Sequence, residues 1–84
     1  MSHLGTLLLV YGESRGGQAL STRLTEGGFD VTLVADGAKA LKTAQEDHPD
    51  IILSLASLPD MSGIDLSNRL KEDVETADIP VALL

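Results

Sequence analysis

The sequence predicts an α/β fold, a three-layer sandwich in which helices cover both faces of a parallel sheet. Short apolar runs of strand length alternate with stretches of helical periodicity, and the connections between them are only a few residues long. The run 51–55 (IILSL) begins fully apolar, which is typical of a strand buried on both faces. The order β-α-β-α-β-α-β then gives parallel strands joined by right-handed crossovers.

The first half of the chain contains two strands and the helix between them. Residues 6–10 (TLLLV) form an apolar run of strand length, and Ser14 is a suitable N-cap for the helix that follows. The pair 16–17 (GG) weakens the first turn of that helix and makes no phosphate-binding loop, because the Gly-Lys-Ser/Thr ending of that motif is missing. A second glycine pair at 27–28 ends the helix. Residues 29–35 (FDVTLVA) alternate and are rich in β-branched residues, so they form the second strand.

A short amphipathic helix and the buried strand come next. Asp36 can cap the helix 38–46, whose apolar residues lie on one side and whose charged residues lie elsewhere. The segment 48–50 (HPD) breaks this helix, and the third strand 51–55 follows.

The last part of the chain is predicted as one more helix and one more strand. The helix covers 64 to about 74, with Leu66, Leu70 and Val74 at positions i, i+4 and i+8. Residues 81–84 (VALL), after Pro80, form a fourth, apolar strand.

Length and composition restrict the function. The 84 residues make at most one small domain, and 13 acidic against 6 basic residues give a net charge of −7. This charge makes nucleic acid a poor direct partner, because phosphate binding needs clustered Lys and Arg. The absence of cysteine excludes disulfides and thiol chemistry. No apolar run has the roughly 20 residues of a membrane span. A cytoplasmic protein is expected.

The segments LLLV, GGFDVTLVADGAKAL, PDIIL, LPDMSGIDL and IPVALL follow one another in a specific order and spacing. In these segments the chain resembles the receiver domain of two-component response regulators, which has a flavodoxin-like fold. The resemblance covers essentially all 84 residues. It implies the strand order 2-1-3-4 and one receiver-like domain, 1–84, truncated after the fourth strand, so that the last α/β units of a receiver are absent.

The resemblance also implies where the phosphorylation chemistry would lie. Receivers accept a phosphoryl group on an Asp four residues before the loop proline, and this position is Leu55. They hold Mg²⁺ with an acidic pair directly after the first strand, at positions that are Tyr11 and Gly12 here. Leucine has no nucleophilic atom, and Mg²⁺ prefers carboxylate and phosphate oxygens. The chain is therefore expected to be a degenerate pseudo-receiver without phosphotransfer.

The loop of the former site keeps its outline but lacks reactive chemistry. We expect no catalytic residue, no metal and no cofactor. Ser54 points to the opposite face from Leu55, and Tyr11 is expected to pack beside Leu55 and fill the vacated pocket. Carboxylates in this region are interpreted as solvated rather than metal-binding, and the two histidines, His3 and His48, as exposed. The remaining loop positions of the former site are Glu13, Ser57, Pro59, Asp60 and Gly63.

The expected function is a phosphorylation-independent signalling module of a phosphorelay-type system that acts by protein–protein interaction. One alternative is an N-terminal fragment of a longer regulator with an output domain, such as a diguanylate cyclase or a DNA-binding domain. Others are a small-ligand-binding domain and a structural remnant that docks on a neighbouring domain. A homodimer through the apolar fourth strand is a further possibility. The candidate contact surfaces are on the first helix (Arg15, Gln18, Thr22) and on the third (Asn68, Lys71, Glu72).

Overall fold

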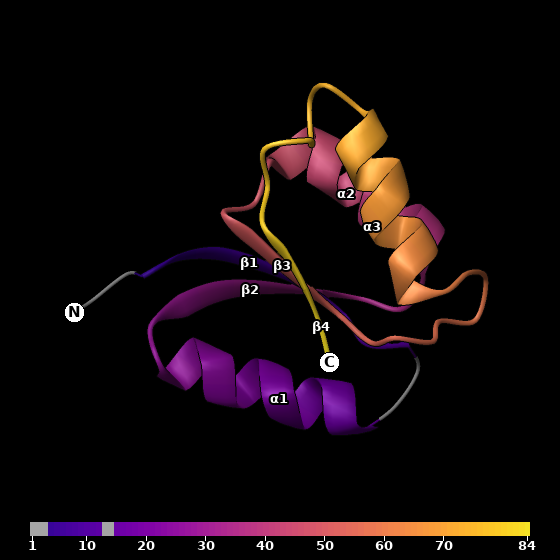
Figure 1. The fold of residues 1–84 in the computed structure, drawn as a ribbon. Helices are drawn as coiled ribbons and strands as arrows, with labels where there is room; N and C mark the ends of the chain where they lie inside the picture. The colour runs from indigo at the N-terminus through magenta and orange to yellow at the C-terminus, as the bar shows by residue number, and fades with distance from the viewer. Residues whose placement is uncertain (1–3, 13–14) are drawn as a thin grey trace.

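The computed structural model describes residues 4–12 and 15–84, and in these ranges it has the predicted α/β architecture (Figure 1). Four parallel strands form one sheet in the order β2-β1-β3-β4, with three helices between them. The predicted fold class and strand order are thus confirmed. Ser14, the expected N-cap, lies outside the described residues. The elements are β1 Gly5–Val10, α1 Arg15–Glu26, β2 Phe29–Val34, α2 Gly37–Asp47, β3 Ile51–Ser54, α3 Gly63–Glu72 and β4 Val81–Leu83.

Strand β1 is the centre of the sheet because it pairs with β2 on one side and with β3 on the other. Its last four residues, 7–10, are fully buried, as the apolar run TLLLV predicts. A reciprocal set of hydrogen bonds fixes the start of the pairing between β1 and β3. The Asp50 carboxylate accepts a hydrogen bond from the Thr6 backbone N–H (2.8 Å), and the Asp50 N–H donates to the Thr6 carbonyl (3.0 Å).

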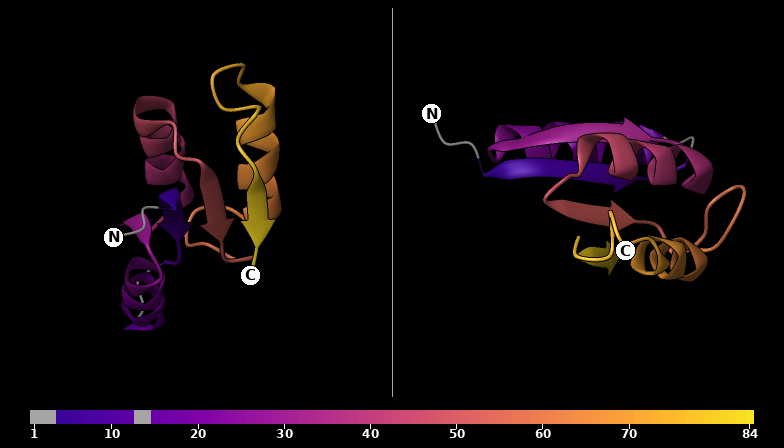
Figure 2. Two further views of the ribbon diagram at one scale, coloured as in Figure 1. Left: turned by 90° about the vertical axis from the view of Figure 1, so that its left-hand side faces the viewer. Right: turned by 90° about the horizontal axis from the view of Figure 1, so that it is seen from above.

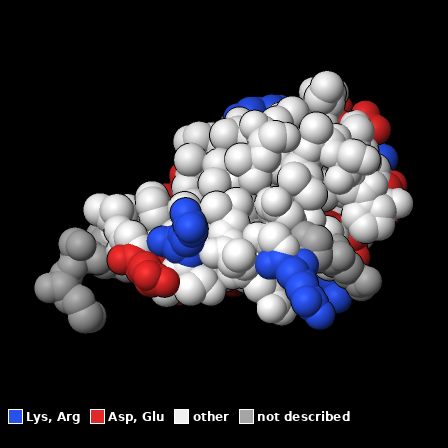
Figure 3. Space-filling model, turned by 90° about the horizontal axis from the view of Figure 1, so that it is seen from below, with Lys and Arg blue, Asp and Glu red and all other residues white. Residues whose placement is uncertain are grey.

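The helices cover the two faces of the sheet unequally. Figure 2 shows α2 and α3 on one face, whereas α1 lies on the opposite face beside β1 and β2. The hydrophobic core lies on the α2–α3 side and includes the buried residues Leu8, Ile52, Leu66 and Leu70. On the other side no described helix covers β3 and β4. Seen from the α1 side, this region is a broad area without charged side chains (Figure 3).

Helix α2 begins and ends where the sequence predicts. The Asp36 carboxylate accepts a hydrogen bond from the Lys39 backbone N–H (2.8 Å), which is the expected N-cap. At the other end His48 adopts a left-handed conformation (φ 46°), and its N–H donates to the Ala44 carbonyl. The His48 ring also lies 3.3 Å from the Asp78 carboxylate, so it joins the segment after α2 to the segment before β4.

Helix α3 is shorter than the sequence predicts, because it ends at Glu72 instead of reaching Val74. Asp73 is extended, and its carboxylate accepts a hydrogen bond from the Glu75 N–H (2.9 Å). The buried Thr76 hydroxyl donates to the Leu70 carbonyl (2.7 Å), so it satisfies a group that a continued helix would have paired. As a result the Val74 side chain points into solvent, where it is 91% exposed. None of the described helices is long and apolar enough to cross a membrane.

Candidate functional site

The candidate site lies at the carboxyl ends of β1 and β3, which is where ligands bind in open parallel sheets. Tyr11 and Leu55 directly follow these two strands. Their positions are neighbours, because Val10 is the register partner of Ser54 and the Leu55 N–H donates to the Val10 carbonyl (2.9 Å). The backbone therefore brings together the two positions that the sequence singles out.

The Tyr11 side chain lies against the start of α1. A methyl group added at Gly16 would come within 3.1 Å of Tyr11 Cε1 and Oη, and one added at Gly17 within 2.9 Å of Tyr11 Cβ. Both distances are shorter than the 3.5–4.0 Å that is optimal for carbon contacts. The glycine pair is thus a flat surface for the ring. The sequence predicted only a weakened helix start here, and the ring contact explains why small residues stand in the first turn.

Leu55 packs against the hydrophobic core, and Gly12 adopts a backbone conformation that favours glycine. The Leu55 side chain is partly buried and packs against the core on the α2–α3 side. Ser54 is fully buried and its hydroxyl donates to the Leu55 carbonyl (2.9 Å), so it is part of the packed interior. Gly12 has φ 77°, a left-handed conformation in which most side chains are strained. The joint packing of Tyr11 and Leu55 in one pocket stays a prediction.

The loop 55–63 between β3 and α3 is a compact turn whose geometry follows from its sequence. The Leu58 N–H donates to the Met61 carbonyl (3.0 Å), so the two ends of the segment 58–61 are joined, with Pro59 directly after Leu58. Ser57 pairs with Ser62 across this turn. The Gly63 N–H donates to the Ala56 carbonyl (2.8 Å), so the start of α3 is tied to the end of β3. A side chain at Gly63 would collide with the Leu55 carbonyl oxygen.

Asp60 connects this loop to α2. Its two carboxylate oxygens accept hydrogen bonds from the backbone N–H groups of Gly37 (2.9 Å) and Ala38 (3.0 Å), at the first turn of the helix. The bond from Gly37, followed by that from Ala38, lowers the pKa of Asp60 against an opposing effect of desolvation. Met61 adds an apolar contact, because a methyl group at Gly37 would come within 2.5 Å of its sulfur. Asp60 is therefore a second cap of α2.

The side chains at the carboxyl ends of β1 and β3 do not fit a magnesium ion. Tyr11 and Leu55 offer no carboxylate, Gly12 has no side chain, and both Asp60 oxygens already accept hydrogen bonds from α2. In residues 4–12 and 15–84 no group of three or more His, Asp or Glu side chains could hold a metal ion. Glu13, the other acid that the sequence analysis considered, lies outside the described residues.

The fold and the placement of this loop are those of a receiver domain. A family model described as "Response regulator receiver domain" matches residues 8–84. The chain therefore belongs to the response regulator receiver family, whose members are signalling modules of two-component systems. The resemblance that the sequence motifs suggested is thus confirmed for the family and its fold.

The relatives of this chain include longer regulators. The probable transcriptional regulatory protein TcrX of Mycobacterium tuberculosis is 34% identical over 79 residues, which are 94% of this chain and 33% of the relative. The response regulator PleD of Caulobacter vibrioides is 40% identical over 65 residues, or 77% of this chain and 14% of PleD. The chain thus spans about a third or less of these two relatives.

Solved structures agree with the fold. The N-terminal domain of a response regulator receiver protein from Methanoculleus marisnigri JR1 matches with a TM-score of 0.87 and 28% identity, over 95% of this chain and 65% of that chain. The receiver domain of the sensor histidine kinase PA1611 from Pseudomonas aeruginosa PAO1 matches with a TM-score of 0.88 and 26% identity, over 94% of this chain and 65% of that chain. The PA1611 structure has a magnesium ion coordinated in its active-site cleft.

Proposed function

We propose that this chain is a receiver domain that signals without phosphorylation, by binding another protein. The observation that supports this most directly is Leu55, which stands at the expected phosphoacceptor position and packs against the hydrophobic core. An acyl phosphate forms only on a carboxylate, and Leu55 has no atom that could attack phosphorus. Tyr11 and Gly12 likewise supply no acidic pair for the metal that phosphoryl transfer needs.

The interaction surface that the structure favours is the helix-free face of β3 and β4. On this face Leu84 is 53% exposed, and Ile51 and Leu53 are only half-buried. Apolar side chains and a free strand edge of this kind are normally covered in a folded protein. A second copy of the chain, joined through β4, is one way to cover them. The surfaces of α1 and α3 are the other candidates.

A second arrangement follows from the length of the relatives. TcrX and PleD are several times longer than the part that this chain matches. In a regulator of that size the domain would act on an output domain, and the face of β3 and β4 would dock within the regulator itself. In either arrangement we propose that residues 1–84 fold as one cytoplasmic unit that makes no direct contact with nucleic acid.

Amide NMR with Mg²⁺ and beryllofluoride, which mimics a phosphoryl group, tests the proposal. We expect no specific shift of the Tyr11 or Leu55 amides. The PA1611 receiver domain, whose structure has a coordinated magnesium ion, is the positive control and should show shifts under the same conditions. Specific and saturable shifts at these residues would refute phosphorylation independence. Sedimentation of the same sample decides the assembly, because a clean monomer at high concentration excludes the dimer through β4.

Restoring one carboxylate is expected to be insufficient. The variant Leu55→Asp supplies the nucleophile but leaves the positions of Tyr11 and Gly12 without metal ligands, so incubation with Mg²⁺ and acetyl phosphate should give no phosphoaspartate. An acid at position 12 would also have to adopt the left-handed conformation of Gly12 (φ 77°). Intact-mass spectrometry measures the added phosphoryl group. Its appearance in the single variant would contradict the argument.

A further inference from the structure

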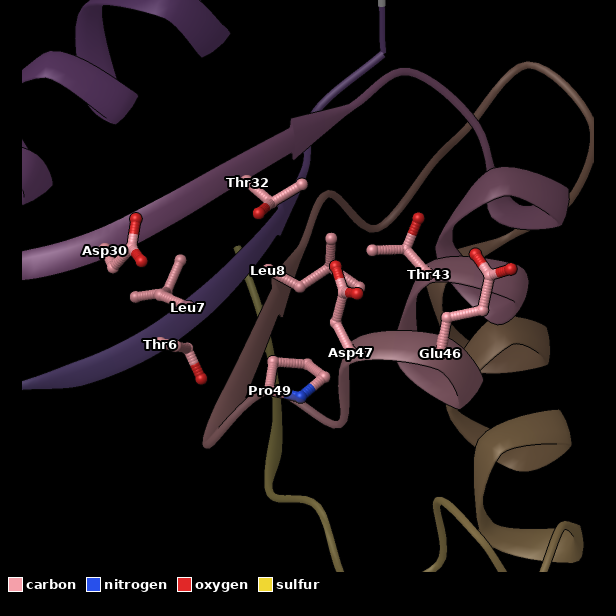
Figure 4. Close-up of a pocket in the computed structure, with 9 residues that line it drawn as sticks. All are labelled: Thr6, Leu7, Leu8, Asp30, Thr32, Thr43, Glu46, Asp47 and Pro49. Atoms are coloured by element: carbon pink, nitrogen blue, oxygen red, sulfur yellow. The ribbon is translucent and has the colours of Figure 1, made fainter.

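A hollow of about 410 Å³ lies between the edge strand β2, the central strand β1 and the last turns of α2 (Figure 4). It is separate from the candidate site described above, because neither Tyr11 nor Leu55 lines it. Its volume is at the small end of the range of ligand pockets, about 300–1,000 Å³. The lining residues are Thr6, Leu7, Leu8, Asp30, Thr32, Thr43, Glu46, Asp47 and Pro49.

The local structure explains how these residues come together. Asp30 and Thr32 alternate along β2, so their side chains share one face of the sheet. They are the register partners of Thr6 and Leu8 on β1. Residues 46 and 47 come three and four positions after residue 43 on α2, so both lie beside it on one side of that helix. Figure 4 shows the two groups on opposite sides of the hollow.

The hollow has an apolar base and an acidic rim. Leu8 is 1% exposed and Pro49 is buried, whereas the three acidic side chains, Asp30, Glu46 and Asp47, are all exposed. In the described part of the chain these three carboxylates form no side-chain hydrogen bond and no ion pair. None of the described residues that line the hollow is Lys or Arg. Among residues 4–12 and 15–84, its charge is therefore of one sign and is not compensated.

We propose that this hollow docks an Arg or Lys side chain, with an apolar neighbour, from a partner protein. Charge complementarity favours a cationic head at the rim, and the apolar base favours the aliphatic stem that such a side chain carries. The hydroxyls of Thr32 and Thr43 add hydrogen-bond acceptors for the same head group. The inference rests on the proposed interaction function, for which it names one surface and the chemistry of the partner.

A short blocked peptide, acetyl-Leu-Arg-Leu-amide, is the probe, and acetyl-Leu-Gln-Leu-amide is its uncharged control. Titration into the ¹⁵N-labelled chain should give saturable amide shifts at Thr32, Thr43 and Asp47 with the Arg peptide only. Binding should weaken as NaCl is added, since exposed charge pairs are screened.

Two double variants with the same change in net charge separate docking from general attraction. Asp30→Asn with Asp47→Asn should raise the Kd about fivefold, the size expected when two exposed ion pairs are lost. Glu26→Gln with Glu72→Gln removes two exposed carboxylates outside the hollow and should change the Kd less than about twofold. Equal weakening by both variants would overturn the proposal.

Other occupants give different results in the same experiment. If MgCl₂ alone shifts the same amides to saturation, the hollow is a cation site, and if these amides shift with protein concentration alone, it holds a second copy. Either result, or identical shifts with the Gln peptide, refutes docking of a basic side chain. None of these outcomes affects the phosphorylation proposal, which is measured at Tyr11 and Leu55 in a separate titration.

Discussion

The contact between the Tyr11 ring and the start of α1 can be measured with a double-mutant cycle. Gly16→Ala should gain about 1 kcal/mol from helix propensity. In the wild-type chain, however, the new methyl group would lie 3.1 Å from two atoms of the ring. Forcing a contact of this kind costs about 1–3 kcal/mol. The net effect of Gly16→Ala in the wild type is therefore expected to range from neutral to about 2 kcal/mol destabilising.

Removal of the ring should reverse the sign. In a Tyr11→Ala background the close atoms are gone, so Gly16→Ala should stabilise the chain by about 0.5–1 kcal/mol. The two measurements then differ by the steric cost, about 1–3 kcal/mol, which is above the scatter of about 0.3–0.5 kcal/mol for independent sites. Urea unfolding of the four chains, followed by circular dichroism, gives these free energies.

Gly27→Ala is the matched control for this cycle. A methyl group there would approach only the carbonyl oxygens of Leu24 and Arg23, at 3.4 and 3.5 Å, so its effect should be the same with and without Tyr11→Ala. If Gly16→Ala is also additive with Tyr11→Ala, the ring does not rest on α1, and the explanation of the glycine pair fails.

Two further changes test contacts of the loops. The pKa of Asp60 is lowered chiefly by the Gly37 N–H, so just below pH 4 the folded chain binds fewer protons than the unfolded chain. The ionised Asp60 carboxylate therefore stabilises the folded chain above that pH, and this contribution is lost as the pH falls further. Asp60→Asn should accordingly reduce the dependence of the thermal unfolding temperature on pH between pH 2 and 6. An unchanged dependence would contradict the double cap of α2. Thr76→Val should lower the free energy of unfolding by about 1–3 kcal/mol, because the buried bond to the Leu70 carbonyl is lost; a change below about 0.5 kcal/mol in urea unfolding would show that the bond is not needed.

The fold was predictable because each strand is a short apolar run with a turn signal on either side. The buried residues 7–10 and the cap at Asp36 are local patterns, and the structure has both as expected. Helix α3 shows where periodicity fails. Val74 continues the apolar spacing, but the turn at Asp73 and the Thr76 hydroxyl compete for the helix end and leave Val74 in solvent.

The candidate site was predictable in position but not in its contacts. The order of the strands alone brings the positions of Tyr11 and Leu55 together, because parallel strands end at one edge of the sheet. The role of Asp60 could not be read from the sequence, since its partner Gly37 is 23 residues away and the carboxylate in a turn resembles any solvated loop acid. The hollow beside β2 was missed for the same reason, because its walls come from elements that meet only in the folded chain.

The two hydrogen bonds from α2 to Asp60 have a mechanical consequence. Helix α2 has 11 residues, so it is a rod about 16 Å long. Asp60 holds one end of this rod, and Glu46 and Asp47 at its other end form one wall of the hollow. A ligand that tilts the rod must therefore also strain the 55–63 loop. By reciprocity, a protein that binds the 55–63 loop in a displaced position would change the affinity of the hollow by the same factor as the occupant of the hollow changes the affinity for that protein.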